Sequence, residues 1–201
     1  MAQSPPRAPP HPCRDPNPQR RSVTKVSWHP DGGRKIAVAY SVLQFQSGQD
    51  DLNVSSYIWD LENPNFPEME LVPPSPLCSI EYSPKDPHIL VGGSYNGLVS
   101  YWDTRKGSQA AGSSAVEFSH RDPVYDVRWI QSKTGSEFFS VSTDGFAYWW
   151  DIRKLSEGPT DTLELVPKGS ETMLGGVRLD YDLSLPTRFM VGTEQGLRAQ
   201  L

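Results

Sequence analysis

Short apolar runs separated by turn residues repeat along the chain. Three six-residue segments, at 23–28, 77–82 and 124–129, have apolar side chains at alternate or near-alternate positions. Such alternation is expected of strands that bury one face. A turn sequence and a second apolar run follow each segment, at 36–40, 88–92 and 138–141. The pattern predicts pairs of antiparallel strands that recur about every 45 residues.

A third strand with a constant ending completes each unit. Six residues before that ending stands a turn former, Asn53, Asn96 or Asp144, and the last two are followed by glycine, which favours a tight hairpin. The endings are the Trp-Asp pairs Trp59-Asp60, Trp102-Asp103 and Trp150-Asp151. A period of roughly 40–45 residues with this signature is typical of the four-stranded blades of a β-propeller.

We therefore predict an all-β fold, an incomplete WD40-type β-propeller of about three full blades and part of a fourth. The expected blades cover about 23–73, 74–119, 120–167 and 174–201, and the last is truncated at Leu201, where a tryptophan would be due. Residues 1–22 contain seven prolines and four arginines. Because such a stretch cannot bury a core, we predict a disordered Pro-rich tail there.

Composition narrows the classes of partner. The net charge is −5 and the lysines and arginines are dispersed, so we expect no nucleic-acid partner. No segment approaches 18 uninterrupted apolar residues, so we expect no membrane span. The two cysteines, Cys13 and Cys78, are too few for a disulfide framework. The histidines lack the spacing of a zinc site. The Gly-Gly and Asn-Gly pairs are not followed by the Lys-Ser or Lys-Thr of a phosphate-binding loop. We expect neither a metal nor a cofactor.

One set of residues in the third unit resembles catalytic machinery. His120, Ser140 or Ser142, and Asp144 are the residue types of a hydrolytic triad, and Trp150 lies in the same blade. The spacing fits a structural alternative better, in which the set forms a buried hydrogen-bond network that satisfies polar groups and fixes register. No glycine-flanked nucleophile elbow is present, so we predict no catalytic residues and no enzyme activity.

The other blades lack a complete set of these residues. Asn53 and Asn96 stand where blade three has Asp144, and no histidine precedes the first strand of the second unit. We therefore expect those two blades to be less tightly tied.

Beyond the repeat, the sequence resembles one family in detail. The similar blocks include 28–41, 56–64, 95–107, 119–125, 131–135, 142–154 and 189–196. They resemble the propeller of the dynein intermediate chains, and within that family the axonemal chains of the outer arm. The resemblance covers about residues 23–197.

The resemblance implies a noncatalytic scaffold that anchors motor heavy chains in the outer dynein arm, for arm assembly and microtubule-based ciliary or flagellar movement. It implies dynein heavy chain, a second intermediate chain and light chains as partners. The implied location is the cytoplasm and cytoskeleton, in the axoneme of a cilium or flagellum. Family members carry a light-chain-binding region and further blades around this segment, and here the Pro-rich residues 1–22 stand in that region's place.

A second kind of scaffold fits two of the Trp-Asp pairs. Arg105 and Arg153 each follow in a Trp-Asp-x-Arg pattern, which is found in propeller substrate receptors of cullin-type ubiquitin ligases, where the arginine contacts the adaptor. Arginine is also common after Trp-Asp in ordinary blades. An adaptor-binding helix ahead of the propeller would discriminate between the two, and the Pro-rich residues 1–22 do not favour one.

Overall fold

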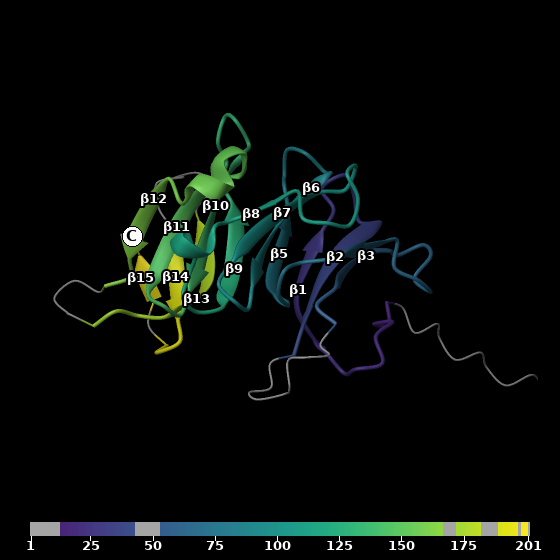
Figure 1. Cartoon of the computed structure of the whole chain (residues 1–201), viewed down its shortest axis with the longest axis horizontal. Helices are drawn as coiled ribbons and strands as arrows, with labels where there is room; N and C mark the ends of the chain where they lie inside the picture. The colour runs from purple at the N-terminus through teal and green to yellow at the C-terminus, as the bar shows by residue number, and fades with distance from the viewer. Residues whose placement is uncertain (1–12, 43–52, 167–171, 182–188, 197, 201) are drawn as a thin grey trace, which may run out of the picture.

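The protein is built from four antiparallel sheets that lie side by side (Figure 1). The computed structural model describes residues 13–42, 53–166, 172–181, 189–196 and 198–200. The first sheet contains β1 (Ser22–Trp28), β2 (Lys35–Ser41), β3 (Ser56–Asp60) and β4 (Met69–Leu71). The second contains β5 (Leu77–Tyr82), β6 (Ile89–Ser94), β7 (Val99–Asp103) and β8 (Gly112–Ser113). The third contains β9 (Val124–Trp129), β10 (Glu137–Ser142), β11 (Phe146–Asp151) and β12 (Asp161–Glu164). The fourth contains β13 (Gly176–Tyr181), β14 (Phe189–Thr193) and β15 (Arg198–Gln200).

Each sheet is one blade, and its strands follow one another outward in chain order. The first strands form the inner row, with β1 beside β5, β5 beside β9 and β9 beside β13. Two short 3₁₀ segments, η2 (Val116–Phe118) and η3 (Ile152–Glu157), lie in the connections. The prediction of an incomplete WD40-type propeller is confirmed.

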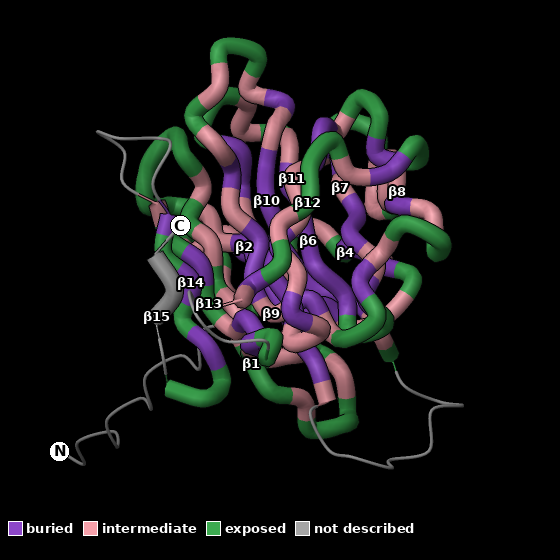
Figure 2. The backbone as a smooth tube through the Cα atoms, turned by 90° about the vertical axis from the view of Figure 1, so that its left-hand side faces the viewer, coloured by how far each residue is buried: buried purple, intermediate pink, exposed green. Residues whose placement is uncertain are grey.

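The core lies between the blades rather than within one of them. Because side chains alternate across a strand, each blade has one apolar face for the preceding blade and one for the next. Ala37 and Ala39 of β2 pack against Leu77 and Ile80 of β5, and all four are fully buried. Equivalent clusters fill the next two junctions, and the buried stretches of the strands are visible in Figure 2.

Blade 1 has the only described first strand whose apolar residues are largely exposed. Val23, Val26 and Trp28 of β1 are 54%, 44% and 59% exposed. Their counterparts in β5 are Leu77, Ile80 and Tyr82, which are 0%, 0% and 5% exposed. The difference follows from position, because blade 1 covers β5 whereas no described blade covers β1.

The predicted first strands agree with the structure, and the outer strands were not predicted. β5 and β9 have the predicted bounds, and β1 begins one residue earlier, at Ser22. The outer strands β4 and β8 have three and two residues, which is too short for an alternating pattern to show in the sequence.

The prediction of a disordered tail over residues 1–22 needs correction in its second half. Residues 1–12 lie outside the described residues. Over 13–21 the chain is packed on blade 1, and the Cys13 amide donates to the carbonyl oxygen of Pro64 at 3.3 Å. Composition predicted disorder for these residues because it carries no information on individual contacts. Arg21 makes several hydrogen bonds that hold the segment on blade 1.

Candidate functional site: polar networks between the blades

A buried polar network lies in blade 3, where the loop ahead of β9 meets the β10–β11 turn. His120 comes from the loop ahead of β9, Ser140 from β10, Asp144 from the β10–β11 turn and Trp150 from β11. The Nδ1 atom of His120 is 2.9 Å from an Asp144 oxygen, and its Nε2 atom is 2.7 Å from the Ser140 hydroxyl. The Trp150 indole N–H donates to the same hydroxyl at 2.8 Å. The structure thus brings four of the five predicted network residues together.

The setting of Ser140 differs from that of a nucleophile. Its side chain is fully buried, and the hydroxyl oxygen is held by both the histidine ring and the indole N–H. A nucleophilic serine needs room for a substrate carbonyl beside it. Ser142, the other serine considered, lies two residues further along β10, where its hydroxyl accepts a 3.4 Å hydrogen bond from the Asp144 amide instead of contacting His120. The geometry therefore favours the structural interpretation.

Asp144 is held as a carboxylate in this network. Burial alone would raise its pKa, but the hydrogen bond and charge of His120, together with the backbone hydrogen bonds from Arg121 and Phe146, lower the pKa below the usual range. The amides of Arg121 and Phe146 also donate to the carboxylate, at 3.0 and 3.1 Å. Asp144 therefore ties the loop ahead of β9 to the β10–β11 turn.

Blades 1 and 2 contain the tryptophan without its acceptor. The strand register places Val38 of blade 1 and Gly92 of blade 2 at the position of Ser140. Trp59 and Trp102 are fully buried like Trp150. The indole nitrogen of Trp102 has no hydrogen-bond partner among the described residues, and that of Trp59 has no serine acceptor and lies near the side chain of Tyr40. The tryptophan is therefore a packing residue in all three blades, and it donates to a serine of the second strand in blade 3 alone among these described blades.

The aspartates of the Trp-Asp pairs close the turn after the third strand. Each carboxylate accepts a hydrogen bond from the amide two residues later, at 3.0 to 3.1 Å. Each also pairs with an arginine: Asp60 with Arg34, Asp103 with Arg105, and Asp151 with Arg153. The arginine hydrogen bond is the main reason that the pKa of each of these carboxyl groups is lowered. Arg105 and Arg153 thus fold back on their own blade.

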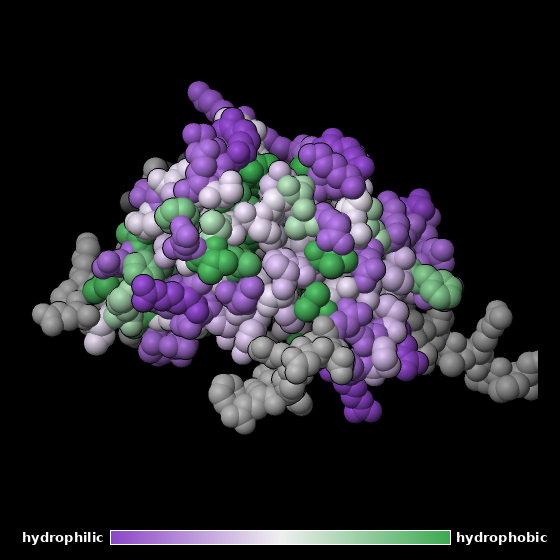
Figure 3. All heavy atoms as spheres, viewed as in Figure 1, coloured by the Kyte–Doolittle hydropathy of each residue, from purple (hydrophilic) through white to green (hydrophobic). Residues whose placement is uncertain are grey.

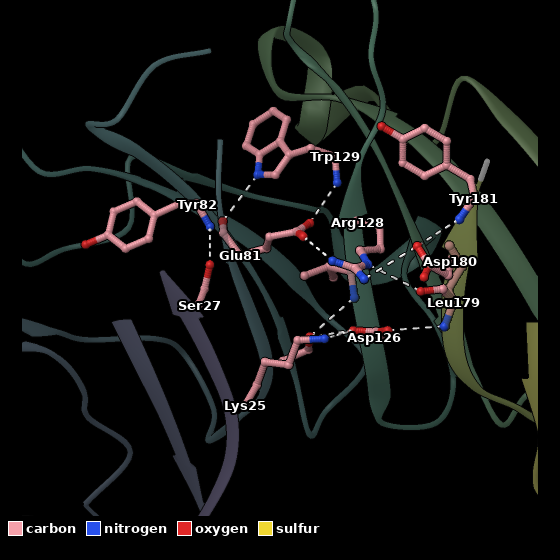
Figure 4. A network of polar contacts seen from close by, with 12 residues as sticks. Lys25, Ser27, Glu81, Tyr82, Asp126, Arg128, Trp129, Leu179, Asp180 and Tyr181 are labelled. Carbon is pink, nitrogen blue, oxygen red and sulfur yellow. Dashed lines mark hydrogen bonds and ion pairs between the residues drawn. The ribbon is translucent and has the colours of Figure 1, made fainter. Parts of the chain in front are cut away.

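A second network, which sequence reasoning missed, runs across the inner strands (Figure 4). Its first row contains the residues at one equivalent position of the four first strands, Lys25, Ser79, Asp126 and Arg178. Asp126 is fully buried at its centre. It accepts from the ammonium of Lys25 at 2.7 Å, from the hydroxyl of Ser79 at 3.1 Å and from the amide of Leu179 at 3.1 Å. One carboxylate therefore joins four blades.

The second row lies two residues further along the same strands, and its members are Ser27, Glu81, Arg128 and Asp180. The Arg128 guanidinium donates to Glu81 at 2.7 Å and lies 3.5 Å from Asp180. Burial raises the pKa of Glu81, although Arg128 and the Trp129 amide, which donates at 2.8 Å, both favour its ionised form. The charged members of this row alternate in sign, with Arg128 between the carboxylates of Glu81 and Asp180.

Both rows share one rule of construction, in which a side chain of one blade bonds the backbone of the next. The hydroxyl of Ser27 accepts from the amide of Tyr82 at 3.0 Å, and Glu81 accepts from Trp129 in the same way one blade later. Such bonds satisfy polar groups at the blade junctions and fix the relative height of the blades. The only signal in the sequence was the polar residue at alternate positions of each first strand.

Two cavities open where the turns of neighbouring blades meet. One, of about 300 Å³, lies between blades 1 and 2, with His29, Tyr82 and His88 in its lining. The other, of about 380 Å³, lies between blades 2 and 3, with Lys85, Trp129 and Lys133 in its lining.

The surface in Figure 3 is mixed in character, with hydrophobic residues in small patches across the middle. Among the described residues, no group of three or more His, Cys, Asp or Glu side chains could hold a metal ion.

Comparison with known proteins places this architecture in a family. The family description "Dynein axonemal intermediate chain 3 WD40 domain" matches residues 16–111, which include blade 1 and the first three strands of blade 2. Over 187 residues, 92% of this chain and 30% of the relative, the sequence is 57% identical to dynein axonemal intermediate chain 2 of Rattus norvegicus. It is 58% identical to the ciliary dynein intermediate chain 3 of Heliocidaris crassispina over 91% of this chain and 31% of the relative. It is 50% identical to the 70 kDa intermediate chain of the Chlamydomonas reinhardtii flagellar outer arm, over 91% of this chain and 32% of the relative.

The chain belongs to the dynein intermediate chain family. It spans about a third of the length of the curated relatives that it matches. The resemblance seen in the sequence blocks is therefore confirmed at the level of the family. Within the residues that the structure describes for this dynein intermediate chain, no helix is long and apolar enough to cross a membrane.

Proposed function

We propose that this chain is the WD-repeat scaffold region of an axonemal outer-arm dynein intermediate chain. The observation that carries the proposal is the match of 50–58% identity over nine-tenths of the chain to axonemal, ciliary and flagellar outer-arm intermediate chains. The matched span is long enough to include strands of all four blades. The proposed location is the axoneme of a cilium or flagellum.

The proposed role is noncatalytic anchoring of motor subunits. Binding residues commonly lie on loops that a rigid scaffold positions, and here the two polar rows and the apolar junctions hold the blades in a fixed order. The proposed partners are dynein heavy chain, a second intermediate chain and light chains. Aromatic and apolar contacts should supply most of the binding energy, since exposed ion pairs contribute little.

Affinity purification from ciliated cells tests this function. A tagged copy of the chain should recover dynein heavy chain, and microscopy should place it along the axoneme. A matched control carries Val127→Asp, which introduces a charge into the fully buried junction between blades 2 and 3 and should abolish recovery. Recovery of a cullin adaptor without any dynein subunit would contradict the proposal.

The ubiquitin-ligase alternative is not favoured by the relatives. Its two arginines are engaged within their own blades, since Arg105 pairs with Asp103 and Asp86, and Arg153 pairs with Asp151. An adaptor would have to compete with these carboxylates for each guanidinium.

A further inference from the structure

A segment ahead of blade 1 covers part of the sheet face that a neighbouring blade covers elsewhere. We call this segment, residues 13–21, the strap. At the inner junctions, the Trp-Asp tryptophan packs against the preceding blade, as Trp102 does against Ala37 and Ala39. In blade 1 the corresponding cluster contains Trp59, which is fully buried, and Cys13 of the strap packs against it.

Arg21 holds the strap in place through hydrogen bonds from all three nitrogen atoms of its guanidinium group. Its Nε and Nη2 atoms donate to the two carboxylate oxygens of Asp15, both at 2.8 Å. Its Nη1 atom donates to the carbonyl oxygens of Asn53 at 3.0 Å and Ser55 at 2.5 Å. The guanidinium carbon lies 4.9 Å from the ring centre of Tyr40, and the side chain is only 1% exposed. The planar guanidinium group, whose donors point in fixed directions, suits such a site far better than the ammonium group of a lysine would.

Arg21 has a setting similar to that of His120 in blade 3, although it lies two residues before Val23 whereas His120 lies four residues before the equivalent Val124. Each residue comes from the segment directly ahead of the first strand of its blade. The ring of His120 stacks on Tyr148 at 4.2 Å, and the guanidinium of Arg21 lies over Tyr57, the register equivalent of Tyr148, at 5.7 Å. His120 bonds to the turn between the second and third strands, and Arg21 bonds to the segment just ahead of the third strand.

The acceptors around this group form a guanidinium site, defined by Asp15, Tyr40, Asn53, Ser55 and Tyr57. We propose that Asp15 of the strap and the remaining groups of blade 1 together form this guanidinium-binding site, and that Arg21, by filling it, clamps the strap over the Trp59 cluster. Blade 1 then has its own form of the network in blade 3, built on arginine and backbone carbonyls instead of histidine and serine. The inference is independent of the proposed dynein function.

Thiol alkylation of the 201-residue chain tests the clamp. Cys13 lies in the strap and is half-buried, whereas Cys78 lies buried in β5 and reports opening of the blades. We expect Arg21→Ala to raise the alkylation rate of Cys13 by roughly tenfold or more, because hydrogen bonds to charged groups are among the stronger ones. The rate at Cys78 should stay unchanged, with both sites read by peptide mass spectrometry. The matched control is Arg20→Ala, at the exposed neighbouring arginine, which should alter neither rate.

Chemical rescue distinguishes a guanidinium site from general packing. In Arg21→Ala, millimolar guanidinium ion should slow the alkylation of Cys13 toward the original rate, whereas methylammonium at the same concentration should not. Asp15→Asn should raise the Cys13 rate less than Arg21→Ala does, since the two carbonyl contacts of Arg21 remain. An unchanged Cys13 rate in Arg21→Ala would overturn the proposal. So would equal acceleration at both thiols, or rescue by methylammonium as well.

Discussion

Blades 2 and 3 have the same four-stranded sheet and the same Trp-Asp ending, but different polar interiors. In blade 3 the indole of Trp150 reaches Ser140 and, through it, His120 and Asp144. In blade 2 the indole nitrogen of Trp102 has no partner among the described residues, and glycine stands at the serine position. Apolar packing is therefore sufficient to build a blade, and the hydrogen-bond network is present in blade 3 and absent from blade 2.

The largest effect should come from Ser140→Ala, which removes the shared centre of the blade 3 network. The change leaves the indole of Trp150 and one nitrogen of His120 buried without a partner. We expect a loss of about 2–4 kcal/mol in the free energy of unfolding, since each orphaned group costs about 1–3 kcal/mol. Urea denaturation measures it, and a loss within experimental error would show that the network does not stabilise the blade.

The converse change, Gly92→Ser, should not convert blade 2 into blade 3. A Cβ atom at Gly92 would lie 3.0 Å from the Trp102 ring, 3.1 Å from Leu77 and 3.2 Å from the carbonyl oxygen of Ser79. These contacts are tighter than ordinary van der Waals separations, so any new hydrogen bond would be offset by crowding. Stabilisation in the same denaturation experiment would contradict this account.

A smaller contrast should separate Asp144→Ala from Asn96→Ala. Asp144 has four hydrogen-bonding contacts to three residues, so its loss should cost about 1–3 kcal/mol. Asn96 is exposed, and its side chain accepts a hydrogen bond from the amide of Leu98 at 3.3 Å, so its loss should stay within about 0.5 kcal/mol. Thermal unfolding of the two variants provides the measurement, and equal shifts would count against the assignment.

The contrast between these variants should also depend on pH. Because the folded-state pKa of Asp144 is lowered, its contribution to stability is present above the unfolded pKa and disappears as pH falls through the folded value. The destabilisation by Asp144→Ala should therefore be full at neutral pH and shrink in acid, while that of Asn96→Ala stays flat. A pH series of denaturation curves decides this, and a constant difference between wild type and Asp144→Ala would contradict it.

The smallest effects should come from the arginines that both blades share. Arg105 and Arg153 pair with the Trp-Asp carboxylates at the surface, where solvent and salt screen the interaction. We expect Arg105→Ala and Arg153→Ala each to change the melting temperature too little to resolve. A large change in only one of them would show that these equivalent pairs are not equivalent in energy.

The sequence predicted what local pattern controls. The alternation of 77–82 and 124–129 and the turn at Asp144-Gly145 placed these strands and this hairpin correctly, because the signals lie within a few residues. The row around Asp126 could not be predicted, since its partners Lys25 and Leu179 are 101 and 53 residues away and meet only in the assembled blades. Arg21 was hidden by its Pro-rich surroundings, and only its contacts reveal its role.

The bonds between successive blades have a consequence for synthesis on the ribosome. Glu81 emerges from the exit tunnel before its partners Arg128 and Trp129, which follow 47 and 48 residues later. Because domains commonly begin to fold during translation, at about 5–20 residues per second, blade 2 waits several seconds with an unpaired inner carboxylate and an uncovered apolar face. Until the next blade arrives, the nascent chain therefore exposes an apolar sheet face near the ribosome.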